Sequence, residues 1–589
     1  MPLKTIDIPV VGPSNNVPQD DPQKTLNFYA EKTGDNWTLK PTPGATLYAQ
    51  LGVNGGGRGS ISLGGRLFGV RGGFFQEIVN GVAVVRGTLA STQNPVGITG
   101  ALPPDGSGQI LIVDGDHGYV FEFVGNVFTE LTEGTHGFVG GLSQAVFCGG
   151  YAASVKPGTN QWQFSSLYNF LDWPGTNYVG LQNTVGNIVA LASTGKSITI
   201  FTDSGFEVWT TEGYTGQFAF TQIVSGFGIG CEAPRSVFAF NRYIYWLGGN
   251  DAGKGVVYRY TEGGSPQRLT DHSTERQIAA ISDPSDAIGY CYQSLGHVFY
   301  VLTFPTGNET ICYDSDTEQW HDRAWRDAVT NYMYAVPYVS VVIHDGKLIG
   351  LDRRNGKFFE ISNDVYTDDG SPIRRERTLP VIPDEADWMS YCSTLELFCE
   401  VGNAPLPTQT TTIETVYGTA LASSPVLHNP SARYIYVGYY LGTDIWVAFA
   451  FSSAAARASY LAGLNFDGFL GVVAGNYSDL PSSVTINDGA DAPLITFDLA
   501  TVSTATLPFS FDVIQNIIQP ANESQVMLTY SANRGMTYGQ EQWQPMGGNS
   551  SYSTRVRWTI GGSAFGFVFK LAVVANHFIS WRKVRVGME

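Results

Sequence analysis

The sequence predicts an all-β protein, with a β-propeller-like core of antiparallel blades, an inserted β-rich module and an extended N-terminal arm. Short apolar and β-branched runs, each closed by Gly, Asn or Asp, recur from about residue 60 to residue 400. Glycine supplies 69 of the 589 residues, and Phe, Trp and Tyr together supply 13%. Tight turns between aromatic, β-branched strands give this composition, and sustained helical periodicity is almost absent.

The runs between residues 60 and 400 favour a propeller over other all-β folds. Ile110–Val113, Tyr119–Val124 and Tyr243–Trp246 are each followed by a Gly-containing turn. A stretch of roughly 340 residues is too long for one simple sandwich, whereas radially repeated four-stranded blades accommodate it and protect the sheet edges. The number of blades stays open.

Changes in composition divide the chain into four segments. Residues 1–59 carry prolines through polar sequence and predict an extended arm that lies along its own domain or a neighbour. Residues 60–402 form the propeller-like core. Residues 403–518 open with a Thr-rich run and are almost free of Lys and Arg, which predicts an inserted, mostly β module. Residues 519–589 are expected to complete the core.

Two local sequences predict structural hairpins. Residues 313–320 resemble the kelch blade hairpin, in which an Asp-containing turn joins two strands and a Trp packs between blades. Its defining residues are Tyr313, Asp314 and Trp320. Residues 531–538 resemble the sialidase-type Asp-box hairpin, with Asn in place of Asp and Tyr in place of Trp. Its defining residues are Ser531, Asn533, Gly535 and Tyr538.

The chain is acidic, because 52 Asp and Glu residues outnumber 34 Lys and Arg residues and give a formal net charge of −18. Coating DNA requires clustered cations facing the phosphates, so we expect DNA to pass this protein rather than be gripped. No signal-like segment follows the first four residues and no apolar run reaches the ~18 residues that span a bilayer, which predicts no membrane segment. Six scattered cysteines are predicted to be buried free thiols.

The C-terminal stretch Trp581–Val586 is strongly basic. In a strand Lys583 and Arg585 share one face, and Arg582 lies opposite Lys583. Two interpretations stay open: a charged edge strand that resists pairing with other sheets, or a contact with an acidic partner.

No motif indicates catalysis, a cofactor or a metal site, so the sequence predicts a non-enzymatic protein. The alternative is a propeller-type glycan hydrolase, which would need two carboxylates flanking the bond to be cleaved. Candidates for such a pair are Asp203, Glu207, Asp314 and Asp316, and no spacing pairs them.

Further motifs occur in a characteristic order along nearly the whole chain. They are Leu26–Ala30, Lys40–Gly44, Gln161–Ser165, Ile198–Trp209, Ile311–Trp320, Leu528–Glu541, Arg555–Trp558 and Phe567–Leu571. Together they resemble the packaged-DNA stabilisation protein of short-tailed bacteriophages (podoviruses), also called the tail accessory factor, tail hub or nozzle. Residues 403–518 depart from the family pattern as an insertion.

The resemblance implies a structural virion protein that forms a homo-oligomeric, usually hexameric, ring below the portal and the head-to-tail adaptor. It implies that the ring extends the DNA conduit, retains packaged DNA until genome ejection, and contacts a tailspike or fibre and a tail needle or plug. Its place would be the virion tail, after assembly in the host bacterial cytoplasm. We expect genomic DNA to pass without sequence-specific binding, since an acidic wall repels phosphate. The alternative function is a glycan hydrolase or depolymerase of the phage tail.

A third interpretation concerns the inserted module alone. Residues 403–518 could be a carbohydrate-binding or fibre-docking module, in which Tyr439, Tyr440, Trp446 or Tyr477 stack on sugars. Packing in the core of the module is the competing use for these aromatic side chains.

Overall fold

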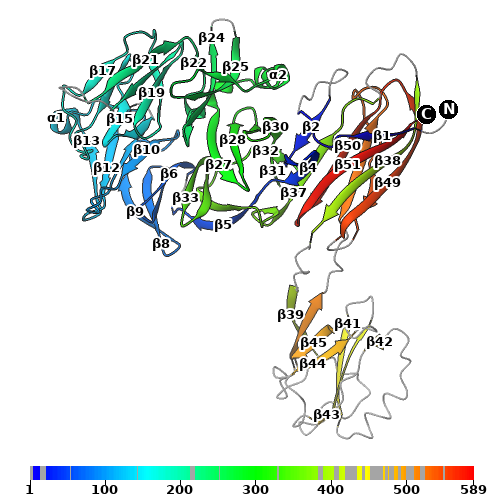
Figure 1. Ribbon diagram of the computed structural model, residues 1–589. Coiled ribbons are helices and arrows are strands. Elements are labelled where there is room, and N and C mark those ends of the chain that lie inside the picture. The colour runs from blue at the N-terminus through cyan, green and yellow to red at the C-terminus, as the bar shows by residue number, and fades with distance from the viewer. Residues whose placement is uncertain are drawn as a thin grey trace. The chain divides into compact units, whose positions relative to one another are not determined.

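The fold is described from a computed structural model of the 589-residue chain. The description covers residues 4–13, 22–52, 55–141, 144–211, 219–250, 253–327, 330–382, 389–402, 524–547 and 551–588, together with the backbone of eight strands between residues 410 and 517. The chain divides into two compact units, residues 1–403 with 523–589, and residues 404–522. The predicted fold class is confirmed, since nearly all described elements are antiparallel strands (Figure 1).

Seven successive blades follow one another in the described part of residues 44–362. The first three contain β6 (Gly57–Leu63), β7 (Arg66–Arg71), β8 (Phe74–Val79) and β9 (Val82–Thr88); β10 (Gly97–Ala101), β11 (Gln109–Val113), β12 (Gly118–Glu122) and β13 (Val127–Leu131); and β14 (Ala145–Cys148), β15 (Tyr151–Val155), β16 (Gln161–Phe164) and β17 (Tyr178–Gly180). In each blade, strands that are neighbours in sequence are neighbours in the sheet.

The next three blades repeat this hairpin order, except that the first two short strands of the fifth blade both pair with its third strand. They contain β18 (Ile188–Ser193), β19 (Ser197–Thr202), β20 (Phe206–Thr210) and β21 (Thr221–Phe227); β22 (Gly230–Cys231), β23 (Phe238–Phe240), β24 (Tyr243–Asn250), β25 (Gly253–Thr261) and β26 (Gln267–Arg268); and β27 (Ile288–Ser294), β28 (His297–Phe304), β29 (Glu309–Asp314) and β30 (Gln319–Asp322). The short helices of this unit are α1 (Glu133–His136), η1 (Pro234–Ser236), α2 (His272–Ala279) and η2 (Pro284–Asp286).

The seventh blade closes the propeller with a strand from the start of the chain. It consists of β33 (Tyr338–His344), β34 (Lys347–Asp352), β35 (Lys357–Ser362) and, as its outermost strand, β5 (Gly44–Gln50). Lys357 of β35 is opposite Gln50 of β5. The small pair β31 (Trp325–Arg326) and β32 (Met333–Tyr334) precedes this blade.

Apolar clusters hold the blades together in a closed cycle. Each pair of consecutive blades, from the first to the seventh, shares one buried cluster. A further cluster joins Leu67 of the first blade to Ile349 and Phe358 of the seventh. Because alternate strand residues point to opposite faces, the apolar runs of the sequence supply both faces of each blade.

A β-sandwich adjoins the propeller within the same unit. One sheet contains β1 (Lys4–Ile8), β3 (Phe28–Thr33), β4 (Asn36–Pro41), β38 (Ser390–Val401), β49 (Ser551–Ala564) and β51 (Ile579–Met588). The facing sheet contains β2 (Lys24–Leu26), β37 (Ser371–Thr378), β47 (Gln525–Ser531), β48 (Gln542–Pro545) and β50 (Val568–Ala575). Phe28, Trp558 and Trp581 are buried between them.

The sandwich changes the expected roles of both chain ends. The arm is predicted to lie along its own domain or a neighbour, and its described residues up to Gln50 lie along their own domain as the paired strands β1–β5. Within the segment predicted at residues 519–589, the described strands β47–β51 belong to the sandwich rather than to a blade, because β50 pairs with β37, and β49 and β51 pair with β38.

Asn27 joins the propeller to the sandwich. Its side-chain amide donates to the Ala324 carbonyl (2.9 Å) and the Arg374 carbonyl (2.8 Å), and its amide oxygen accepts from the Ala324 backbone N–H (3.0 Å). Ala324 follows the sixth blade, whereas Arg374 lies on β37 of the sandwich. The bonds are part of a continuous sheet that runs from β30 through β2 to β37.

The second unit, residues 404–522, is β-rich in its described part. One sheet has the order β39 (Thr410–Tyr417), β46 (Ser510–Ile517), β45 (Pro493–Asp498) and β44 (Ser483–Asn487). In the other, β40 (Tyr434–Tyr440) pairs with β41 (Ile445–Phe451), β42 (Phe469–Leu470) and β43 (Gly475–Asn476). This unit corresponds closely to the module predicted at residues 403–518.

Two sequence expectations concern the whole chain. All six cysteines are buried and form no disulfide, as predicted. Among the described residues, no helix is long and apolar enough to cross a bilayer.

Candidate functional site

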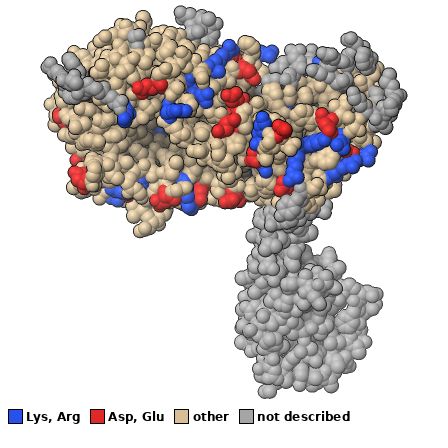
Figure 2. Space-filling view, viewed as in Figure 1, with Lys and Arg blue, Asp and Glu red and all other residues tan. Residues whose placement is uncertain are grey.

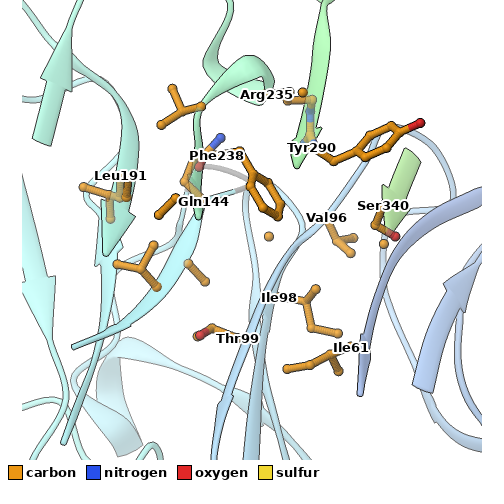
Figure 3. Close-up of a pocket in the computed structure, with 18 of the residues that line it drawn as sticks. Ile61, Val96, Ile98, Thr99, Gln144, Leu191, Arg235, Phe238, Tyr290 and Ser340 are labelled. Atoms are coloured by element: carbon orange, nitrogen blue, oxygen red, sulfur yellow. The ribbon is translucent and has the colours of Figure 1, made fainter. Parts of the chain in front are cut away.

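An open axial cavity of about 460 Å³ lies between the inner strands of the propeller (Figure 3). The innermost strands of the blades line it, and Ile61, Ile98, Leu191 and Phe238 give it mostly apolar walls. Its size falls in the range of small-molecule sites, about 300–1,000 Å³. No local pattern in the sequence predicts this cavity, because each blade contributes only a few lining residues from one short segment.

The predicted kelch-like hairpin lies in the sixth blade. Tyr313 is opposite Trp320 in the β29–β30 pair, and their ring centroids are 5.1 Å apart. The Trp320 indole N–H donates to the Leu269 carbonyl (3.0 Å), and the ring packs in the cluster shared by the fifth and sixth blades. Its role is therefore to fasten two blades.

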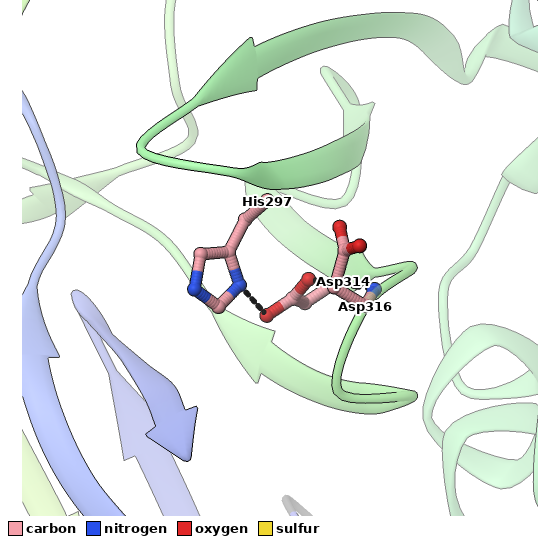
Figure 4. A group of neighbouring side chains, drawn as sticks. All are labelled: His297, Asp314 and Asp316. Atoms are coloured by element: carbon pink, nitrogen blue, oxygen red, sulfur yellow. Dashed lines mark hydrogen bonds and ion pairs between the residues drawn. The ribbon is translucent and has the colours of Figure 1, made fainter. Parts of the chain in front are cut away.

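Asp314 fixes the turn of this hairpin from a buried position (Figure 4). Its carboxylate accepts from the Asp316 backbone N–H (3.0 Å), the Thr317 hydroxyl (2.7 Å) and His297 Nδ1 (2.7 Å). The hydrogen bond to Asp314 raises the pKa of His297 against the effect of burial.

His297, Asp314 and Asp316 offer ligand atoms within 4.8 Å of one another, a grouping that could in principle hold a cation. However, Asp316 also accepts from the Val298 backbone N–H (2.7 Å). Both carboxylates already accept hydrogen bonds from backbone N–H groups in or beside the turn. The grouping therefore stabilises the conformation of the turn.

The predicted Asp-box-like hairpin joins β47 to β48 and therefore belongs to the sandwich rather than to a blade. The Ser531 hydroxyl accepts from the backbone N–H of Gly535 (2.9 Å), and the Asn533 amide oxygen accepts from that of Thr537 (2.9 Å). Gly535 has a φ of 90°, a conformation that glycine adopts readily. Tyr538 is exposed beside this turn.

The basic C-terminal residues pair with carboxylates of their own chain. Arg582 is 2.7 Å from Glu400, Arg585 is 2.9 Å from Asp7, and Lys583 contacts the same aspartate. Strand β51 lies between β38 and the β1 and β4 strands, so the edge-strand interpretation is wrong. Over the sandwich, Lys and Arg side chains lie beside Asp and Glu side chains (Figure 2). Contact of these residues with an acidic partner stays a prediction.

Of the four carboxylates considered for hydrolysis, Asp203 and Glu207 lie in the fourth blade, whereas Asp314 and Asp316 share the β29–β30 turn, where both accept hydrogen bonds from backbone N–H groups. Asp203 is exposed at the β19–β20 turn. Glu207 is buried, and one of its oxygens accepts from the backbone N–H groups of Asn183 (2.8 Å) and Thr184 (2.9 Å). Asp314 is buried as well and cannot reach a sugar. A cleft flanked by two free acids is not formed by these four residues.

A polar groove of about 460 Å³ lies where β37 faces the sixth blade. Glu376 in this groove is 2.6 Å from Arg374 and 3.3 Å from Lys570. Burial acts to raise the pKa of Glu376, but Lys570 and Arg374 outweigh it and keep that pKa below its ordinary value. A catalytic acid needs the opposite shift.

The aromatic residues considered for sugar binding lie in the second unit. Tyr439 and Tyr440 lie on β40, and Trp446 lies on β41; for these strands the structure describes the backbone alone. Tyr477 lies outside the described residues.

Two protein-family models match the chain. The model described as bacteriophage P22 Gp10, beta-propeller, matches residues 22–366, and the one described as bacteriophage P22 Gp10, beta-sandwich, matches residues 494–589. A search of curated proteins found no match.

Similar solved structures include the N-terminal domain of Nup159 (12% identity, 58% of this chain and 98% of that chain, TM-score 0.35). Another is the extracellular domain of a one-component system from B. thetaiotaomicron (10% identity, 82% of this chain and 62% of that chain, TM-score 0.36).

Proposed function

Because the chain belongs to the family of bacteriophage P22 Gp10, a structural protein of the phage tail, we propose that it forms the hub, or nozzle, ring of a short tail. In this proposal the ring lies below the portal and adaptor, extends the DNA conduit, retains the packaged genome and docks tailspikes or fibres. A tail needle or plug would close it, and assembly would take place in the host cytoplasm. The observation that carries the proposal is the family match over both the propeller and the sandwich.

The conduit would lie between subunits rather than along the propeller axis. The axial cavity has the volume of a small-molecule site, about 460 Å³, and has no room for a DNA duplex. A wall built by a chain of net charge −18 would repel phosphate and let DNA slide.

Mass measurement of the full-length protein, with and without its adaptor protein, tests the ring. We expect a species of about six times the subunit mass of 63.8 kDa, formed alone or on the adaptor. A protein that stays monomeric and never joins the adaptor would overturn the proposal. Release of reducing sugar from host polysaccharide, abolished by one carboxylate substitution, would favour the hydrolase instead.

The inserted module is proposed to be peripheral to the ring, because it is a compact unit of its own. A variant in which residues 404–522 are replaced by a short Gly-Ser linker should fold and assemble like the full chain. Loss of folding, or a folded variant that no longer assembles, would assign the module to the ring itself.

A further inference from the structure

The axial cavity of the propeller is unusual for so acidic a chain. Its described lining includes two arginines, Arg58 and Arg235, and no Asp or Glu. The remaining walls are mostly aliphatic and come from the inner strands, with Ile61, Val96 and Ile98 on one side and Leu191 and Phe238 on another (Figure 3). A cavity that combines apolar walls with two arginines and no acid favours a ligand that is both anionic and partly apolar.

The guanidinium of Arg58 has a structural role, and its N–H groups already donate to groups of the protein. It is buried, and it donates to the carbonyls of Gly72 (2.9 Å) and Ser91 (2.8 Å) and to the Ser91 hydroxyl (2.7 Å). That hydroxyl in turn donates to Asp114 (2.6 Å), and the Asp114 charge also attracts the Arg58 guanidinium directly. Arg58 is therefore held in place at the cavity wall, and Asp114 behind it balances part of its charge.

Arg235 is the arginine that can bind a ligand. Among the described residues it makes one hydrogen bond, from Nη2 to the Pro95 carbonyl (2.7 Å), and no ion pair. A guanidinium has five N–H donors, so most of the Arg235 donors are not used by that bond. Burial and the neighbouring Arg58 charge lower the pKa of Arg235 to about 10. An anion at this position would relieve the repulsion between the two guanidinium groups.

We propose that the axial cavity binds a monovalent carboxylate with an aliphatic or aromatic body. The carboxylate pairs with the Arg235 guanidinium, and the apolar body lies among Ile61, Ile98 and Leu191. Two contributions then add: a charge-assisted hydrogen bond to the partly buried Arg235 guanidinium, and burial of apolar surface at about 25 cal/mol per Å². The inference concerns the propeller alone and does not depend on the ring proposed above.

The test is calorimetric titration of the full-length protein with decanoate, 1-decanol and decyltrimethylammonium. We expect decanoate to bind at least tenfold more tightly than 1-decanol, and decyltrimethylammonium to bind most weakly. Arg235→Gln should remove the preference for decanoate while leaving the thermal unfolding of the protein close to that of the wild type. Arg242→Gln, which changes an exposed arginine outside the cavity lining, is the matched control and should bind like the wild type.

A second variant tests whether the ligand binds inside the axial cavity. Ile98→Trp fills part of the chamber from an inner strand and should weaken decanoate binding at least tenfold. Three results would overturn the proposal: no decanoate binding by the wild type, equal binding of decanoate and 1-decanol, or binding that neither Arg235→Gln nor Ile98→Trp changes.

Discussion

The propeller and the sandwich use similar strands but assemble them from very different distances along the chain. Six of the seven blades come from consecutive hairpins, so their partners lie a few residues apart. The sandwich combines residues 4–41, 371–401 and 524–588, and its β1–β51 pair joins Lys4 to Met588. One compact unit therefore contains a propeller whose contacts are mostly local in sequence and a sandwich that forms only when the first and last strands pair.

The two parts also differ in what they bury. The clusters between blades are aromatic and aliphatic, whereas the sandwich interior also encloses Arg375 and Arg377, which are fully buried. Arg375 donates to the Ala575 carbonyl at 3.3 Å. Near Arg375, Asp368 is buried where β36 (Thr367–Asp368) meets β5 and β37. Polar groups thus concentrate where the propeller passes into the sandwich.

The largest effect should come from emptying either core. Trp581 of the sandwich and Trp246 of the propeller are both fully buried. Trp581→Ala and Trp246→Ala should each cost about 3–5 kcal/mol, from lost burial and the cavity left behind. Hydrogen–deuterium exchange should rise in β38 and β51 for the first variant and in β20 and β24 for the second. Equal increases in both regions for either variant would mean that propeller and sandwich unfold as one.

A pH-dependent effect should come next and should arise at the junction. Burial raises the pKa of Asp368 to about 7, against the attraction of Arg375 and Arg354. The unfolded chain, with an Asp pKa of about 4, therefore ionises first as the pH rises. The contribution of this group to stability is complete below pH 4 and is lost by about pH 7.

Asp368→Asn should remove this dependence. Its free energy of unfolding relative to the wild type should increase by up to about 4 kcal/mol between pH 4 and pH 8. Chemical unfolding over that pH range measures the difference, in which the other titrating groups cancel. Asp364→Asn changes an exposed neighbour and serves as control. A constant difference between Asp368→Asn and the wild type would contradict the assignment.

The smallest effect should come from Asn27, which has a φ of 54° and bonds both parts. Asn27→Ala should cost about 1–3 kcal/mol, because buried backbone groups lose their partners. Asn27→Gly keeps the left-handed backbone at no steric cost and should be roughly 1 kcal/mol less harmful. Chemical unfolding measures both variants. If Asn27→Ala were as stable as the wild type, the Asn27 side-chain bonds would add nothing to the sheet that already joins the propeller and the sandwich.

The locally encoded features were accessible from the sequence. Apolar runs with their turns predicted the blades, and the side chains of Asp314 and Ser531 act within a few residues of their own positions. Trp320 lies between blades because the kelch-like pattern places it opposite Tyr313.

The remaining features depend on distant partners. Nothing near Lys583 and Arg585 indicates that Asp7 lies beside them. The closure of the seventh blade by β5 and the buried position of Glu207 likewise depend on pairings that no local pattern encodes. Arg235 belongs to no recognisable motif, and its place in the axial cavity becomes visible only when the other six blades are in position.

The pairing of Lys4 with Met588 has a consequence for biosynthesis. A ribosome that adds about 5–20 residues per second needs roughly half a minute to two minutes between these two residues. During this interval the middle blades can form, whereas β1 and β4 have no β51 to pair with. Strand β1 therefore stays without its partner until the residues of β51 have been synthesised.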